Sequence, residues 1–180
     1  IAKAVATSGA VLYVSAEESA RQVALRARRL GCTDDNVLVL AEPTVESVAE
    51  TVRKHRPVLV VADSVQAMIS DRVPAVPGSV TQVREVASQL AQLAKRDGPP
   101  VILVGHVTKE GLVAGPKSLE HMVDVVLDFD GSSGQPHRTL RVTKNRFGRA
   151  LELALLALGD AGLDEVANPL LSVRHPVYDL

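Results

Sequence analysis

The unbroken apolar run 57–62 is followed by two polar residues that could bind a ligand or a metal ion, Asp63 and Ser64. Such a run suits a strand that is buried on both faces, as in a parallel sheet. Ligands of open α/β sheets bind beyond the carboxyl ends of the strands, and an aspartate placed there is how a Walker B element holds Mg²⁺ against a nucleotide. An aspartate that only caps the next segment explains these residues equally well.

Two other apolar runs also end in polar groups. Residues 11–14 lead to Glu17 and Glu18, and residues 101–104 lead to His106. A carboxylate one strand away from a Mg²⁺-binding Asp63 is well placed to orient or deprotonate water. Taken alone, the two glutamates fit a helix N-terminus and His106 fits a buried hydrogen-bonding histidine. The expected convergence of all three strand ends favours a catalytic site.

Two basic segments are candidates for binding phosphate. The Gly-containing stretch 105–117 carries Lys109 and Lys117, which could follow a nucleic-acid backbone. Lys144 and Arg146 lie in a predicted turn between two strands, from which they could reach a phosphate, including one in a neighbouring subunit. An ordinary surface turn and a solvated basic hairpin tip are the alternative interpretations.

The order of apolar segments predicts an α/β fold. Strands alternating with helices are typical of βαβ units and a mostly parallel sheet. Helices are expected from Ser19, from Thr44 and from Ser79, the last with a capping-box pattern to Gln82. Residues 68–78 contain two prolines and are expected to form an exposed loop. Expected strands cover 11–14, 37–40, 57–63 and 101–104, and then 123–129, 138–143 and 151–158, which should pair antiparallel at one edge of the sheet.

Composition narrows the possible classes of protein. The chain has 180 residues, 46% of them hydrophobic, which is enough for one well-packed core. Lys and Arg number 20 against 21 Asp and Glu, so a nucleic-acid surface must be a local patch. The single Cys32 excludes an internal disulfide and a multi-cysteine zinc site. Aromatic residues make up only 2%, which argues against stacking of bases. With no apolar stretch of membrane length, we expect a soluble, cytoplasmic protein.

The chain resembles the RadA/Sms DNA-repair proteins, which are relatives of RecA. Resemblance extends over roughly residues 1–173. Its most specific part is the pentapeptide from Lys144 to Gly148, a signature of that family. The other matching segments are 11–19, 63–64, 77–85, 104–111 and 114–121.

The resemblance implies a RecA-like three-layer sandwich over residues 1–173, followed by a tail at 174–180. It also implies a DNA-dependent ATPase that uses ATP and Mg²⁺ for branch migration in recombinational repair. The partners would be single-stranded and branched DNA, and further copies of the chain in a hexameric ring.

By matching position, each candidate residue takes a role. Glu17 would activate water, Asp63 would be the Walker B ligand of Mg²⁺, with Ser64 at the nucleotide, and His106 would sense the γ-phosphate. Lys144 and Arg146 would act on the nucleotide of the adjacent protomer or on coupling to DNA. DNA would contact a first loop, 68–78, and a second, 109–117, through Arg72, Arg84, Lys109 and Lys117.

Some features of that family are absent from these 180 residues. They contain no G-x-x-x-x-G-K-[ST] motif to cradle phosphates, no four-cysteine zinc element and no Lon-protease-like domain. We therefore expect most of an ATPase core from a larger protein, inactive by itself. The alternative is a catalytically inactive module for DNA binding and assembly. An oxidoreductase is disfavoured, because no G-x-G-x-x-G follows a strand.

Overall fold

The computed structural model describes residues 1–106, 119–131, 136–150, 152–159 and 162–166. The chain divides into two units, Ile1–Val123 and Asp124–Leu180, which are considered separately. The predicted tail at 174–180 lies outside the described residues.

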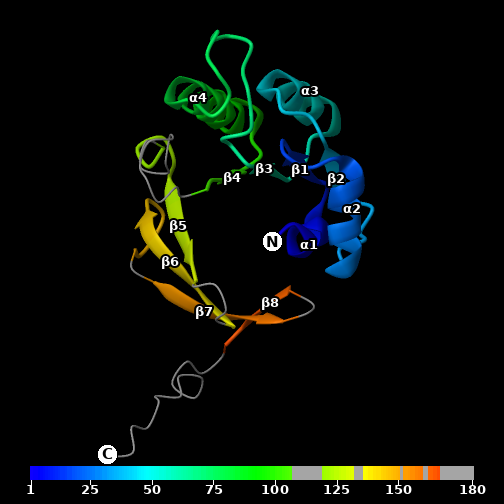
Figure 1. Ribbon diagram of the computed structural model, residues 1–180, viewed down its shortest axis with the longest axis vertical. Coiled ribbons are helices and arrows are strands. Elements are labelled where there is room, and N and C mark those ends of the chain that lie inside the picture. Colours follow the sequence, from blue (N-terminus) through cyan, green and yellow to red (C-terminus); the bar gives the residue numbers. More distant parts are fainter. Residues whose placement is uncertain (107–118, 132–135, 151, 160–161, 167–180) are drawn as a thin grey trace, which may run out of the picture. The chain divides into compact units, whose positions relative to one another are not determined.

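The first unit contains a four-stranded parallel sheet. Its strands are β1 (Val11–Ser15), β2 (Val37–Leu40), β3 (Leu59–Asp63) and β4 (Val101–Val104), in the order β2-β1-β3-β4 (Figure 1). All three ladders are parallel. The predicted strands and their parallel pairing are confirmed.

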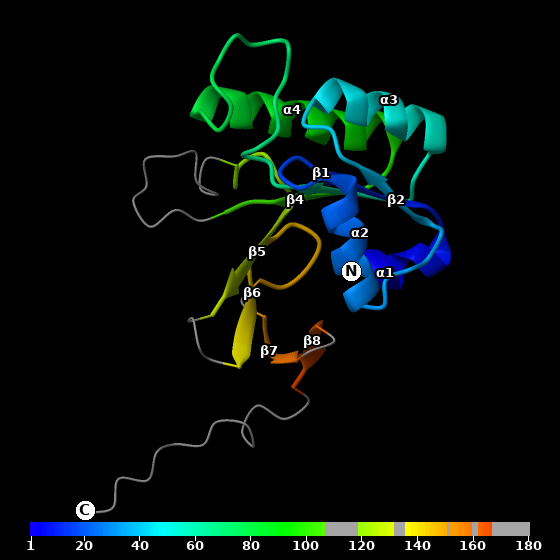
Figure 2. The same ribbon diagram turned by 45° about the vertical axis from the view of Figure 1, so that its right-hand side comes forward.

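Helices cover both faces of this sheet and complete three layers. Figure 2 shows α3 (Val45–His55) and α4 (Val80–Asp97) side by side over one face, and α1 (Ala2–Val5) and α2 (Ala20–Arg29) on the opposite side. A short 3₁₀ helix, Ala6–Ser8, continues α1. The RecA-like three-layer arrangement is confirmed for this unit.

Two-sided burial explains the unbroken apolar run of β3. Val60 and Ala62 belong to the core cluster under α3 and α4, whereas Leu59 and Val61 belong to the cluster that includes Ala6. All four residues are buried. A strand covered on both faces has no position for an exposed polar side chain, so polar chemistry is confined to its end.

The helices begin where they were predicted to, but the hydrogen bonds of their N-cap residues do not always follow the predicted pattern. Ser79 accepts a hydrogen bond from the Gln82 amide at 3.3 Å, yet the Gln82 side chain does not return to Ser79. A full capping box is formed instead by Ser19 and Gln22 at the start of α2. Thr44 is the N-cap of α3, but its hydroxyl donates to the Ser47 hydroxyl.

The prediction that 68–78 is wholly exposed was wrong at its beginning. Met68 is fully buried in the core and Ser70 is 2% exposed. The buried carboxamide of Gln82 accounts for this, because it accepts from the Ser70 amide and donates to the carbonyls of Ser70, Val73 and Ala75 at 2.9–3.1 Å. One side chain of α4 thus satisfies four backbone groups of the loop.

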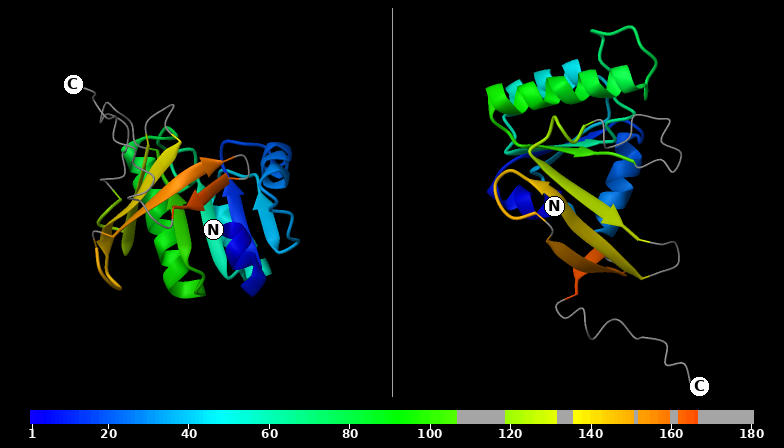
Figure 3. Two further views of the ribbon diagram at one scale, coloured as in Figure 1. Left: turned by 90° about the horizontal axis from the view of Figure 1, so that it is seen from below. Right: turned by 90° about the vertical axis from the view of Figure 1, so that its left-hand side faces the viewer.

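The second unit contains an antiparallel meander, β5-β6-β7-β8, whose strands follow one another in Figure 3. They are β5 (Val125–Asp130), β6 (His137–Asn145), β7 (Leu153–Gly159) and β8 (Gly162–Glu165). The predicted antiparallel pairing is confirmed, but the strands form a sheet of their own. The prediction missed β8 because Leu163 is its one large apolar residue, and pairing with β7 defines the strand.

No helix within the described residues is long and apolar enough to cross a membrane.

Gln82→Leu is expected to destabilise the fold by about 3 kcal/mol, because it leaves buried backbone groups of the loop without partners. Gln92→Leu is the matched control, since Gln92 lies exposed on the same helix and bonds only to Ser88; its effect should stay below about 0.5 kcal/mol. Urea unfolding followed by circular dichroism compares the two. Equal midpoints would show that Gln82 does not anchor the loop.

Candidate nucleotide site

The site is built on the carboxyl ends of three adjacent parallel strands. Ser15 of β1 is in register with Asp63 of β3, and the Ala16 amide donates to the Asp63 carbonyl at 2.9 Å. On the other side the Val65 amide donates to the Val104 carbonyl at the end of β4, also at 2.9 Å. These bonds fix the backbone from which the candidate side chains project.

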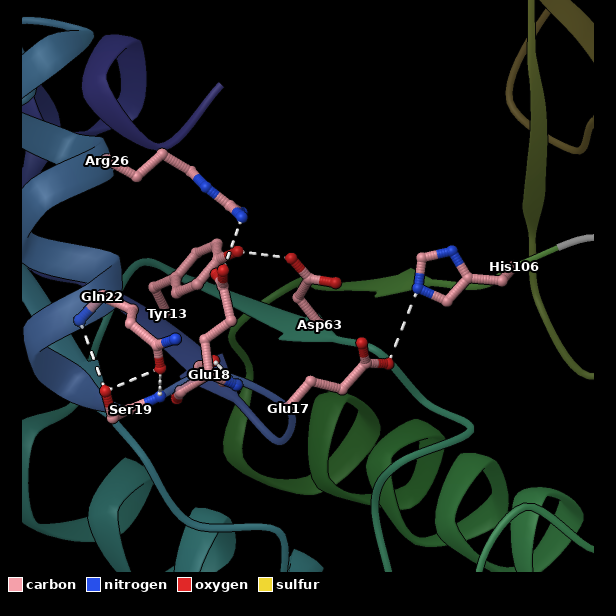
Figure 4. Close-up of polar contacts among 9 residues, drawn as sticks. Tyr13, Glu17, Glu18, Ser19, Gln22, Arg26, Asp63 and His106 are labelled. Carbon is pink, nitrogen blue, oxygen red and sulfur yellow. Dashed lines mark hydrogen bonds and ion pairs between the residues drawn. The ribbon is translucent and has the colours of Figure 1, made fainter.

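The carboxylate of Asp63 is held by the phenol of Tyr13. The Tyr13 hydroxyl donates to Oδ2 of Asp63, as Figure 4 shows. Burial raises the pKa of Tyr13 well above its usual range, and the hydrogen bond and the negative charge of Asp63 add to the rise. The phenol therefore remains a donor at neutral pH and fixes one oxygen of Asp63.

Glu17 faces the same region from the segment after β1. The buried Ser64 hydroxyl donates to Oε1 of Glu17. Nε2 of His106 lies 3.6 Å from that same oxygen (Figure 4). The side chains of Glu17 and His106 are 50% and 62% exposed, so water reaches both. The predicted convergence of Glu17, Asp63 and His106 is thus present in the structure.

Glu18 is engaged elsewhere. Its Oε1 lies 2.6 Å from Nη2 of Arg26 on α2, and its amide donates to the Ser15 hydroxyl at 3.1 Å. Residue types alone left Glu17 and Glu18 equivalent and the family resemblance favoured Glu17; the structure gives the two carboxylates different partners. Glu18 ties the segment to α2, while Glu17 keeps one carboxylate oxygen without a hydrogen bond from the described residues.

Three contributors to the site were missed from sequence. From sequence, Tyr13 was only a residue of the expected strand 11–14, and neither Arg26 nor Gln66 was a candidate. Gln66 donates from Nε2 to the His106 carbonyl at 3.1 Å, across 40 residues of sequence. For Tyr13 the sequence did offer one indication. Successive side chains of a strand point to opposite faces, so Tyr13 and Ser15 of β1 lie on the same face.

Ser64 was predicted to contact nucleotide, and its placement argues for another role. It is completely buried, and its hydroxyl is donated to Glu17. A side chain with no exposed surface cannot touch a bound nucleotide without rearrangement. Ser64 instead positions the carboxylate of Glu17.

The predicted DNA-binding residues are only partly described. Arg72 is exposed in the loop before α4, 4.0 Å from Glu85, and Arg84 is exposed on α4. Lys109 and Lys117 lie outside the described residues, so their DNA-binding role stays a prediction.

The basic pentapeptide belongs to the second unit. Lys144 lies within β6, opposite Val126, and not in the turn as predicted. Only Arg146 is in the turn, where its Nη1 contacts Oδ1 of Asp124 at 2.8 Å. The strand extends beyond the expected 138–143 because Lys144 and Asn145 also pair with β5, opposite Val126 and Val125.

The donor set suits Mg²⁺ bound with phosphate. Asp63 offers Oδ1, which accepts no hydrogen bond from the described residues, and Glu17 offers a second carboxylate nearby. No cluster of three metal-ligating side chains occurs among the described residues. Mg²⁺ commonly takes one or two carboxylates and completes its shell with water and substrate phosphates, which fits this arrangement.

The fold and the site define a class of protein. Residues 2–112 match the family described as AAA domain, and the parallel sheet with helices on both faces is that of a RecA-like domain. The chain is 49% identical over 158 residues to the DNA repair protein RadA of Pseudomonas aeruginosa, covering 88% of this chain and 35% of that protein. It is 47% identical over 169 residues to RadA of Aquifex aeolicus, covering 94% of this chain and 38% of that protein.

RadA of Streptococcus pneumoniae is 48% identical over 161 residues, which cover 89% of this chain and 38% of the relative. The chain belongs to the RadA/Sms family. It spans somewhat over a third of the length of these relatives.

Tyr13 is expected to ionise well above the usual tyrosine range, because burial and Asp63 both disfavour the phenolate. An absorbance titration of Tyr178→Phe, which leaves Tyr13 as the single tyrosine of a chain without tryptophan, measures this directly. Adding Asp63→Asn should lower the pKa, since it removes the charge. Because the folded pKa is raised, stability should fall as pH rises above the unfolded value of about 10.

A Tyr13 that titrates near pH 10 while circular dichroism still reports a folded chain would contradict the placement of its hydroxyl against Asp63.

Proposed function

We propose that this chain provides the catalytic carboxylates of a DNA-dependent ATPase in DNA repair, with ATP and Mg²⁺ as cofactors. The observation that carries the proposal is the meeting of Glu17, Asp63 and His106 at the carboxyl ends of adjacent parallel strands. This is where α/β sheets bind ligands. Membership of the RadA/Sms family supports the same conclusion.

Each residue contributes a separate step. Asp63, with one oxygen fixed by Tyr13, would hold Mg²⁺, and the ion would supply charge stabilisation at the phosphates. Glu17, held by Ser64, orients the attacking water and accepts its proton. His106 lies close enough to Glu17 to respond to a change of charge there, and Gln66 fixes the backbone of His106.

The DNA-facing part of the proposal rests on cations outside the carboxylate site. Arg72 and Arg84 are exposed near the start of α4. We propose that Lys109 and Lys117, which lie outside the described residues, also contact DNA. We further propose that the whole protein acts as a hexameric ring in the cytoplasm, on single-stranded and branched DNA, and drives branch migration. In that ring Lys144 and Arg146 would act on the nucleotide of the adjacent protomer or on coupling to DNA.

The 180-residue chain contains no G-x-x-x-x-G-K-[ST] motif, so the proposed site lacks a phosphate cradle of that type within this sequence. We therefore propose that hydrolysis is a property of the whole protein and that this chain by itself is inactive. The alternative function is an inactive module for DNA binding and assembly. The ATPase measurements on the whole protein described next distinguish the two.

Glu17→Gln in the whole protein is expected to keep ATP affinity and to lower kcat by about 10²–10⁴-fold, because the amide retains the shape but cannot accept the proton. Glu18→Gln is the matched control, since that carboxylate is paired with Arg26 and, among the described residues, makes no hydrogen bond to Asp63, Ser64 or His106. It should leave kcat within about twofold. Steady-state ATPase rates and nucleotide titrations with DNA present measure both variants.

Equal loss of kcat in the two variants would point to a structural effect on the shared segment. An unchanged rate for Glu17→Gln would remove Glu17 from the chemistry. A whole protein without any ATPase activity would favour the inactive module.

A further inference from the structure

Gln66 links the turn after β3 to the backbone of His106. Its Nε2 donates to the His106 carbonyl at 3.1 Å. The same turn follows Asp63 directly and contains Ser64, whose hydroxyl donates to Glu17. The end of β3 and its turn thus supply one side chain of the candidate site and hold the other two, and Gln66 is the residue that reaches His106.

Folding stability does not explain a glutamine at position 66. The side chain is half-buried, and its Oε1 is buried with no hydrogen-bond partner among the described residues. A buried acceptor without a donor lowers the stability of a fold. The hydrogen bond from Nε2 is exposed, so water competes for both of its groups. An apolar side chain of similar size, such as methionine, would therefore suit the fold at least as well.

The hydrogen bond of Gln66 is also not needed to pair β3 with β4. Asp63 already lies opposite Val104 in the parallel ladder, and the Val65 amide donates to the Val104 carbonyl at 2.9 Å. The side chain of Gln66 acts beyond these bonds, where the ladder has ended. Its effect is therefore on the backbone at His106 and not on the sheet.

The backbone on either side of Gln66 is fixed. The Val65 amide is bonded to β4, and the Ala67 amide donates to the Ser64 carbonyl at 3.1 Å. A side chain that starts from a fixed backbone can hold its partner in a defined place.

His106, in contrast, is weakly held by its own side chain. The side chain is 62% exposed, and Nε2 lies 3.6 Å from Oε1 of Glu17, which is longer than a hydrogen bond (Figure 4). The imidazole makes no hydrogen bond within the part of the chain that the structure describes. The direction of the imidazole therefore depends on the backbone that carries it, and Gln66 holds the carbonyl of that residue.

We propose that Gln66 is a positioning residue of the nucleotide site, which holds the backbone of His106 so that the imidazole faces Glu17. The glutamine is present for this task and at some cost in stability. The effect on catalysis rests on the proposed ATPase function, whereas the placement of His106 can be measured without ATP.

The test compares two variants of the whole protein. Gln66→Met keeps the approximate size of the side chain but cannot donate a hydrogen bond. Gln92→Met is the matched control, because Gln92 is exposed on α4 and donates only to Ser88 among the described residues.

The first measurement is the rate at which diethyl pyrocarbonate modifies His106, followed by peptide mass spectrometry. His55, exposed at the end of α3, is the internal reference. In Gln66→Met we expect His106 to react about two- to tenfold faster, the factor that corresponds to one net hydrogen bond, because Nε2 no longer faces Glu17. The rate at His55 should not change, and Gln92→Met should match the unchanged protein at both histidines.

The second measurement is steady-state ATP hydrolysis with DNA present. Gln66→Met is expected to lower kcat by about tenfold and to leave KM within about twofold, since Gln66 acts on His106 and not on binding of the nucleotide. The midpoint of thermal unfolding should stay the same or rise, because the variant removes a buried oxygen without a partner. Loss of activity without loss of stability separates positioning from a structural role.

An unchanged modification rate at His106 in Gln66→Met would overturn the proposal, whatever the ATPase assay shows. A lower unfolding midpoint together with faster modification of His55 would overturn it as well, since it would indicate a general loosening of the fold. So would an unchanged kcat in a variant whose His106 reacts faster. A whole protein that hydrolyses no ATP would refute the proposed function, while the rate at His106 would still decide whether Gln66 positions that residue.

Discussion

The parallel pairing of β1 with β3 is the interaction on which the proposed site depends. In this pairing Val11 lies opposite Leu59 and Ser15 lies opposite Asp63. One further backbone hydrogen bond, from the Ala16 amide to the Asp63 carbonyl, continues the pairing beyond the end of β1. The segment leaving β1 is therefore held beside the end of β3. A one-residue slip would turn Asp63 to the opposite face and separate it from Tyr13.

Burial of β3 on both faces then dictates where polar groups can lie. The core clusters on its two sides leave Val60, Val61 and Ala62 without access to water. Asp63 is the first position with partial exposure, and Ser64, again buried, satisfies its hydroxyl through Glu17. The same packing that stabilises the sheet thus concentrates the carboxylates at one edge, where a charged ligand and water can reach them.

Much of this architecture was predictable, because hydrophobic runs and turn residues are local signals. The four parallel strands, the helices that begin after Ser19, Thr44 and Ser79, and the placement of Glu17 just after the strand that pairs with the Asp63 strand follow from those signals and from the geometry of parallel sheets. Hydrogen bonds between residues far apart in sequence do not follow from local signals. Tyr13 bonds to Asp63, 50 residues away, and Gln66 to the His106 carbonyl, 40 residues away. Strand alternation indicates which face Tyr13 occupies but does not identify Asp63 as its partner.

The loop before α4 shows a second reason for failure. Gln82 matched a capping box, but its side chain bonds instead to the Ser70 amide and to the carbonyls of Ser70, Val73 and Ala75, in preference to the single N-cap amide. Lys144 was placed in a turn because its charge suggests exposure, whereas pairing with β5 extends the strand through it. In both cases tertiary hydrogen bonding overrode a local preference.

The most direct test of the account is the position of the metal. Crystals of the whole protein, grown with Mn²⁺ and a non-hydrolysable ATP analogue, would reveal that position through the anomalous scattering of the ion. We predict a peak bound to Asp63, directly or through one water, with Glu17 facing the terminal phosphate. A metal and triphosphate bound elsewhere on the protein, with Asp63 and Glu17 in contact only with their present partners, would contradict it.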